Sequence, residues 1–205
     1  MPPTVNARIP LSLLEAIRLL DTPDDQVDTE YVPELRNKRL GLSDTVYTQI
    51  RRYNEAMKRD QPVPFAEAEG LGTLIARRPD ADQLFEKAGY ILAHEVYSSV
   101  SPTRRATIRF LPRFLGRPMA LAQLQVAVQK YFAGTLERTG SFLSLRIPAS
   151  ATVNGSTKSS GCAFYESALR EMLNVFVDGG GKVDHPSCAQ RGDAECEWRA
   201  EWSNS

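Results

Sequence analysis

Histidine and tryptophan are scarce in this chain, whose 205 residues include two of each. Only three cysteines are present, and an odd number cannot be paired completely within one disulfide framework. No apolar run reaches the roughly 18 residues that a transmembrane helix needs, so we expect no membrane-spanning segment. The 25 basic side chains balance 25 acidic ones, and bulk charge therefore gives no support for nucleic-acid binding.

Catalytic signatures are also missing. The sequence has no Gly-x-Ser-x-Gly, no phosphate loop and no Gly-x-Gly-x-x-Gly after a strand. Two histidines leave little room for a Ser-His-Asp arrangement, and we therefore favour a protein without enzymatic activity. The N-terminus lacks the charged-then-apolar plan of a signal peptide, so we expect a cytoplasmic protein with reduced thiols.

Hydrophobic residues make up 42% of the chain, enough to bury a core. Their spacing, with caps and breakers, predicts helices over 9–20, 44–59, 66–77, 81–100, 103–112, 119–136 and 162–178. Strands are predicted over 142–147, 182–187 and 195–202, and residues 21–39 are predicted to be a linker or surface loop. We expect an α+β fold, with a helical layer packed on a small antiparallel sheet. Residues 1–70 would form a partly irregular helical extension, and residues 71–205 the main domain.

All three cysteines and one histidine lie near the C-terminus. Cys188 and Cys196 flank a turn-forming run around Gly192, which predicts a hairpin with the two thiols facing each other. Cys162 precedes an apolar-periodic stretch, and a helix N-terminus there would favour its thiolate. With His185, these side chains fit a closed tetrahedral zinc site of structural type. Two alternatives stay open: a Cys188–Cys196 disulfide with Cys162 free, or three buried thiols without a metal.

This cysteine pattern, together with Tyr165 and Trp198, resembles the 4-vinyl reductase domain family over roughly residues 71–202. That family includes bacteriochlorophyll 4-vinyl reductase-like proteins and the aromatic-sensing domains of catabolic activators. Its fold is similar to TRAPP-complex subunits and to haem nitric-oxide-binding domains. In the sensors three cysteines and a glutamate hold zinc. The resemblance assigns the cysteine ligands to Cys162, Cys188 and Cys196, and His185 stands where those sensors have the glutamate.

The resemblance also implies an apolar cavity between the helices and the sheet, for a small aromatic, lipidic or tetrapyrrole-like ligand. Family members often form dimers, so the resemblance allows a homodimer, while the sequence itself does not fix the oligomeric state. The apolar faces of the predicted elements supply candidates for the cavity lining, although such side chains are also typical of an ordinary core. The candidates are Phe110, Leu124, Val128, Phe132, Phe142, Tyr165, Leu169 and Phe176.

Arginines are concentrated in one part of the chain and could hold a carboxylate, a phosphate or an acidic protein. This cluster consists of Arg104, Arg105, Arg109, Arg113 and Arg117. A second basic side, around Arg51 and Arg59, could contact anionic lipid, although such runs are more often a solvated helix face.

Three functions follow as hypotheses. The first is a non-catalytic, zinc-containing protein that binds a hydrophobic or tetrapyrrole-like molecule. The second is an assembly subunit whose N-terminal extension and arginine cluster dock onto a protein partner, in a pigment–protein or membrane-associated complex. The third is a reductase of a vinyl tetrapyrrole, for which the sequence shows no nicotinamide or flavin site of its own.

Overall fold

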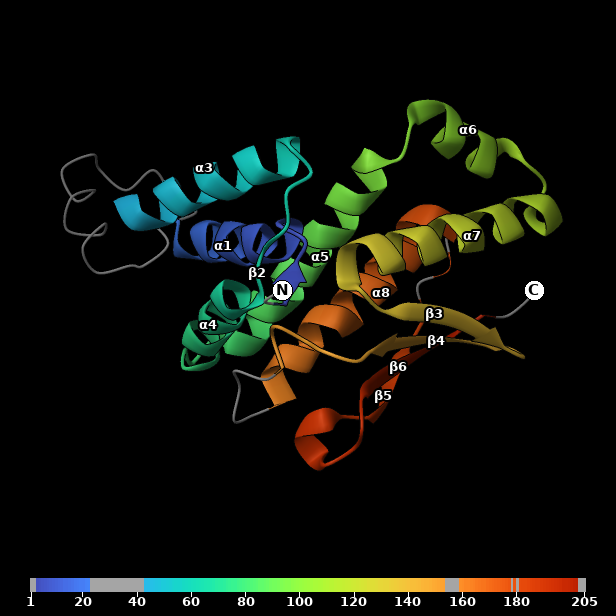
Figure 1. The fold of residues 1–205 in the computed structure, drawn as a ribbon. Helices are drawn as coiled ribbons and strands as arrows, with labels where there is room; N and C mark the ends of the chain where they lie inside the picture. Colours follow the sequence, from blue (N-terminus) through green and yellow to red (C-terminus); the bar gives the residue numbers. More distant parts are fainter. Residues whose placement is uncertain (1–2, 23–42, 154–158, 178, 180, 203–205) are drawn as a thin grey trace.

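The computed structural model of the protein is an α+β structure in which helices cover a small antiparallel sheet (Figure 1). It describes residues 3–22, 43–153, 159–177, 179 and 181–202. The predicted class, a helical layer on an antiparallel sheet, is confirmed. None of the helices within these ranges combines the length and the apolar character that crossing a bilayer requires. The predicted linker over residues 21–39 falls almost entirely outside the described ranges.

Three helices form the N-terminal part of the molecule: α1 (Arg8–Asp21), α3 (Asp44–Lys58) and α4 (Phe65–Ala76). Ser43 caps α3, because its side chain accepts a hydrogen bond from the Val46 backbone at 3.3 Å. The three predicted helices in this part are therefore confirmed, with ends shifted by one residue or so. Two short strands, β1 (Thr4–Val5) and β2 (Val63–Pro64), were not predicted and pair antiparallel.

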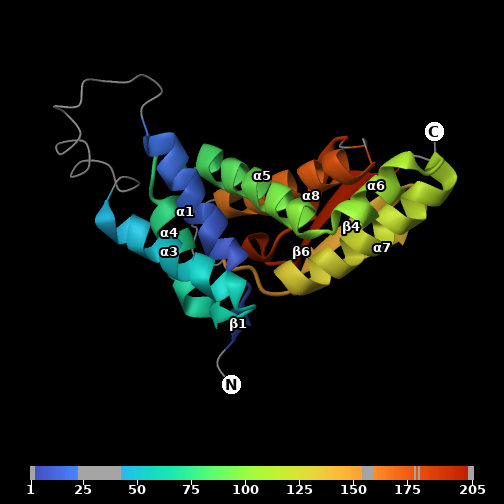
Figure 2. The same cartoon turned by 90° about the horizontal axis from the view of Figure 1, so that it is seen from above.

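The centre of the molecule is a pair of helices, α5 (Ala81–Ser99) and α8 (Cys162–Val177), which lie side by side in both views (Figures 1 and 2). Their backbones come very close at Gly89 of α5. A Cβ added there would lie 2.2 Å from the carbonyl oxygen of Phe164. Only glycine permits this approach, because every other residue carries a Cβ.

The larger sheet has the strand order β3 (Thr135–Thr139), β4 (Phe142–Ile147), β6 (Cys196–Glu201), β5 (Val183–Ser187). Every neighbouring pair is antiparallel, and β5 with β6 forms the predicted C-terminal hairpin. Leu145 of β4 lies opposite Leu136 on one side and Trp198 on the other. All three side chains are buried, since they share the face on which α7 and α8 pack.

The arginine-rich part forms α6 (Pro102–Phe110) and α7 (Arg113–Phe132). The prediction placed Pro118 in the first turn of a helix over 119–136, and this is wrong at both ends. Pro112 is the N-cap, and α7 continues through Pro118, which costs it the backbone hydrogen bond that Pro118 cannot donate. The helix ends at Phe132, and its C-cap Ala133 adopts a left-handed conformation with φ 52°. Leu136 lies beyond this end, in β3.

One continuous core joins both sides of the predicted boundary at residue 70. Ile17 of α1 and Tyr53 of α3 are buried in the same cluster as Leu92 of α5 and Leu173 of α8. Ion pairs also link the two sides of this boundary. Arg78, before α5, contacts Asp21 of α1 at 2.8 Å and Asp80 at 2.8 Å. The Asp21 side chain is only 5% exposed, so Arg78 neutralises a buried charge at the end of α1.

Replacing Arg78 by glutamine is expected to destabilise the protein by about 2 kcal/mol. The change removes the guanidinium that lies 2.8 Å from the buried Asp21 carboxylate, while the part-exposed position of that guanidinium limits the loss. A hydrogen bond from Arg78 also lowers the pKa of Asp80. The stability that this lowered pKa contributes is complete above the pKa of Asp80 in the unfolded state, about 4. It is lost as the pH falls through the lower pKa of Asp80 in the folded state. Urea unfolding at neutral and acidic pH measures both effects, with Arg77→Gln as the exposed control.

Candidate metal centre

Four potential metal ligands converge where α8 meets the C-terminal hairpin. Cys162 is the first residue of α8, His185 lies in β5, Cys188 follows that strand and Cys196 begins β6. One ligand atom from each of the four lies within 4.8 Å of all the others. The Sγ atoms of Cys162 and Cys188 are 3.6 Å apart. Two thiolates on one tetrahedral zinc would be about 3.8 Å apart, given zinc–sulfur bonds of about 2.3 Å.

The loop between Cys188 and Cys196 is held by its own hydrogen bonds. The backbone N–H of Cys188 donates to the Asp193 carboxylate at 2.7 Å, and that of Ala189 donates to the Cys196 sulfur at 3.3 Å. Gly192 adopts φ 95°, a left-handed conformation that favours glycine. The chain thus brings the two sulfurs together by local geometry, which lowers the entropic cost of closing the site.

His185 is oriented by an aromatic neighbour. Its ring stacks on Trp198, with the centroids 4.7 Å apart and the planes 8° from parallel. Its Nε2 atom is buried and has no hydrogen-bond partner among the described residues. A buried polar atom without a partner is costly, and coordination of a cation would compensate for it. The donor set of three sulfurs and one imidazole therefore fits a metal ion, and this cluster can hold one.

The electrostatics of the cluster also favour a cation. A hydrogen bond from the Cys162 thiol lowers the pKa of Cys196 to about 4, more than burial raises it. The same hydrogen bond, followed by burial, raises the pKa of Cys162. The two shifts have opposite directions because the Cys162 proton lies in a hydrogen bond to Cys196. Binding of a metal ion would displace that proton.

All three cysteines are free thiols. Cys196 accepts hydrogen bonds as a sulfur ligand would, and does not pair covalently with Cys188. Of the alternatives left open by the sequence, the disulfide is therefore absent from this structure.

The eight candidates for a cavity lining do not come together around one cavity. Phe110 is 85% exposed on α6 and Phe142 is 44% exposed on β4, so neither lies inside the helical layer. Phe176 lines a different cavity from Phe132 and Tyr165. The remaining candidates, Leu124, Val128 and Leu169, are buried core side chains.

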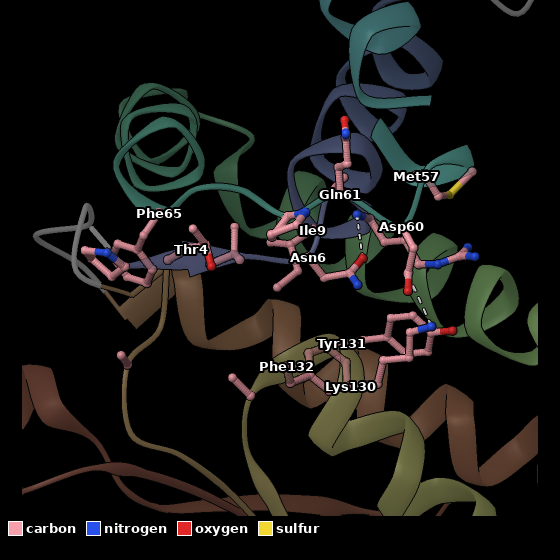
Figure 3. A pocket seen from close by; sticks show the side chains of 18 of the residues that line it. Thr4, Asn6, Ile9, Met57, Asp60, Gln61, Phe65, Lys130, Tyr131 and Phe132 are labelled. Atoms are coloured by element: carbon pink, nitrogen blue, oxygen red, sulfur yellow. Dashed lines mark hydrogen bonds and ion pairs between the residues drawn. The ribbon is translucent and has the colours of Figure 1, made fainter. Parts of the chain in front are cut away.

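Phe132 and Tyr165 line a cavity of about 410 Å³ that the N-terminal residues help to enclose (Figure 3). One wall carries Thr4, Asn6 and Ile9, and the end of α3 and the loop after it supply Met57, Asp60 and Gln61. Lys130 reaches Asp60 at 3.3 Å at an exposed position. Sequence reasoning missed this N-terminal wall, because no local pattern indicates that Thr4 and Phe132 meet.

Tyr165 separates this cavity from the cysteine cluster. Its ring lies 5.6 Å from that of Phe132 and 5.0 Å from that of Trp198, measured between centroids. Burial raises the pKa of its hydroxyl to about 12, so the side chain is neutral at physiological pH. The second histidine, His94, contacts Glu171 at 2.9 Å and lies apart from the cluster.

The arginine cluster lies on α6 and the start of α7. Arg104 contacts Gln123, Arg105 lies over the Tyr97 ring and Arg117 lies over the Trp202 ring. Arg109 is exposed, and the Arg113 side chain lies outside the described part of the structure.

Two residues of the cysteine pattern support the metal ligands. Asp193 lies in the loop between Cys188 and Cys196 and accepts a hydrogen bond from the Cys188 backbone, and Trp198, two residues after Cys196, stacks on His185.

Comparison with protein-family models, with curated proteins and with solved structures finds no match to this chain.

Proposed function

We propose that the protein is a non-catalytic, zinc-stabilised domain that binds one small hydrophobic molecule. Zinc is the metal that three thiolates and an imidazole suit best, and a reducing compartment keeps such thiols available. Four protein ligands complete its tetrahedron and leave no position for a substrate, which assigns the ion a structural role. This is also the function expected of a chain that resembles the 4-vinyl reductase domain, and kinship with that family is part of the proposal.

The observation that carries the ligand-binding part is the cavity beside Tyr165 and Phe132. Its volume of about 410 Å³ lies in the lower part of the range of ligand sites, about 300 to 1,000 Å³. Phe65, Phe132 and Tyr165 supply aromatic surface, while Asn6 and Gln61 supply a few polar groups. The charged side chains of the lining are paired, Asp60 with Lys130 and Arg8 with Glu95. This lining favours an uncharged ligand of one or two rings over a complete tetrapyrrole.

Replacing Ala149 by tryptophan is expected to weaken binding of a two-ring probe, 1-naphthol, about tenfold or more. Ala149 is exposed at the cavity, so a large side chain can fill the cavity without entering the core. Fluorescence titration of the purified full chain measures the affinity. The control is Ala122→Trp, at an exposed position on α7 that does not line this cavity. Equal affinity in wild type and Ala149→Trp, or no saturable binding by wild type, contradicts the proposal.

A further inference from the structure

A second cavity, of about 400 Å³, lies where α6 and the start of α7 face the end of α8. Its apolar walls come from Tyr97 of α5, Ile108 of α6 and Phe176 of α8. Three members of the arginine cluster, Arg105, Arg109 and Arg117, also line it. Among the described residues, no acidic side chain contributes to this lining. The cavity therefore combines apolar surface with three guanidinium groups.

Two of the three guanidinium groups are held in place by aromatic rings. Arg105 lies 5.1 Å from the centroid of Tyr97, and Arg117 lies 5.5 Å from that of Trp202. The Nε atom of Arg105 is buried and has no hydrogen-bond partner among the described residues. Because these groups are oriented before any ligand arrives, they would lose little entropy when they bind an anion. Phosphate is, with carboxylate, an anion whose geometry matches a planar guanidinium through two parallel hydrogen bonds.

Large apolar side chains are exposed next in sequence to residues that line this cavity. Phe110, between the lining residues Arg109 and Leu111, is 85% exposed, and Phe114, just before Gly116, is 73% exposed. Leu115 and Met119 on α7 are also exposed. Helix α6 and the first turns of α7 form a protruding corner at one end of the molecule (Figures 1 and 2). Exposed aromatic residues beside arginines on a convex corner are typical of surfaces that enter a membrane interface.

From these observations we propose that the α6–α7 corner docks on an anionic membrane. The arginine-lined cavity takes the phosphate head group of an acidic phospholipid, and Phe110 and Phe114 enter the acyl boundary. The protruding shape favours a bilayer over a protein partner, which would need a complementary recess. Docking on this surface does not depend on the zinc site or on the cavity beside Tyr165, because α6 and the start of α7 supply neither the metal ligands nor the lining of that cavity.

Co-sedimentation of the full chain with vesicles tests this proposal. We expect binding to phosphatidylcholine vesicles that contain phosphatidylglycerol, weak binding to phosphatidylcholine alone, and a marked loss at high salt. Each basic side chain near an anionic bilayer contributes about fivefold to partitioning, so Arg105→Gln with Arg109→Gln should reduce it about 25-fold. Phe110→Ser with Phe114→Ser should also reduce binding, and both of these positions are exposed, which keeps the fold intact.

Matched control variants test whether vesicle binding depends on the α6–α7 corner or on exposed basic charge elsewhere on the protein. Arg51→Gln with Arg59→Gln removes two exposed charges, one on α3 and one at its C-cap, and is expected to leave vesicle binding unchanged. Leu74→Ser, at a position 54% exposed on α4, controls for the loss of exposed apolar surface. Equal binding to neutral and anionic vesicles, or equal losses in the α3 variant, overturns the proposal. Saturable binding of inorganic phosphate or a soluble acidic protein, without vesicle binding, overturns it in favour of those ligands.

Discussion

Cys188→Ser is expected to abolish zinc binding and to lower the melting temperature by about 12 °C. A metal that binds only the folded state, at a thousand times its dissociation constant, stabilises a protein by about 4 kcal/mol. For a chain of this length, each kcal/mol corresponds to about 3 °C. Cys188 is 1% exposed and lies between β5 and β6, so loss of the metal should loosen this hairpin first. Elemental analysis, thermal unfolding and hydrogen exchange measure the three effects.

The two histidines provide a matched pair for the same experiment. His185→Gln is expected to weaken zinc binding strongly, because it removes the only nitrogen in the donor set. His94→Gln should leave the metal content at one ion per chain, since His94 contacts Glu171 away from the cluster. Wild-type protein that contains no metal, with three thiols titrating freely, would contradict the zinc proposal but leave the α+β fold unaffected.

Gly89→Val is expected to destabilise the protein by about 3 kcal/mol or more. The first added carbon alone would lie 2.2 Å from the Phe164 carbonyl oxygen and 2.9 Å from the Ala168 backbone nitrogen. Both atoms belong to the backbone of α8, which cannot move aside as a flexible side chain can. Helices α5 and α8 must therefore separate, and the core between them, including Phe164 and Leu92, must repack. Urea unfolding measures the change in free energy.

Gly70→Ala is the control for this substitution. Gly70 also lies inside a helix, α4, but a Cβ there would have no atom within 4 Å. Alanine at this position is expected to stabilise the protein by up to about 1 kcal/mol, since glycine costs a helix that amount of backbone entropy. If both glycine variants shift stability equally, the close contact between α5 and α8 is not what Gly89 provides.

The sequence was most informative where structure depends on neighbours along the chain. Ser43 caps α3 by reaching three residues ahead, and the spacing around Gly192 closes the Cys188–Cys196 loop. The four candidate metal ligands were named from residue type and spacing, and the structure places them in one cluster. The class of fold and the C-terminal hairpin also followed from local periodicity.

The start and end of α7 were predicted wrongly because the prediction used only local signals, a proline at the start and an apolar period at the end. Pro118 is typical of a first turn, yet the helix tolerates it in the interior, where α6 packs against the preceding residues. Leu136 continues the apolar pattern of the helix, but its position opposite Leu145 places it in a strand. Strand pairing decided its conformation, and pairing is invisible to helical periodicity.

Which side chains surround each cavity depends on contacts between distant parts of the chain. The sequence grouped Phe110 and Phe142 with Phe132 and Tyr165 as apolar residues, whereas the fold exposes the first two and buries the others. Thr4 and Asn6 meet Phe132 more than a hundred residues away along the chain. Caps and loops are set by atoms a few residues apart, so the sequence determines them. Cavities form where distant elements fail to fill the space between them, and this depends on how the whole chain packs.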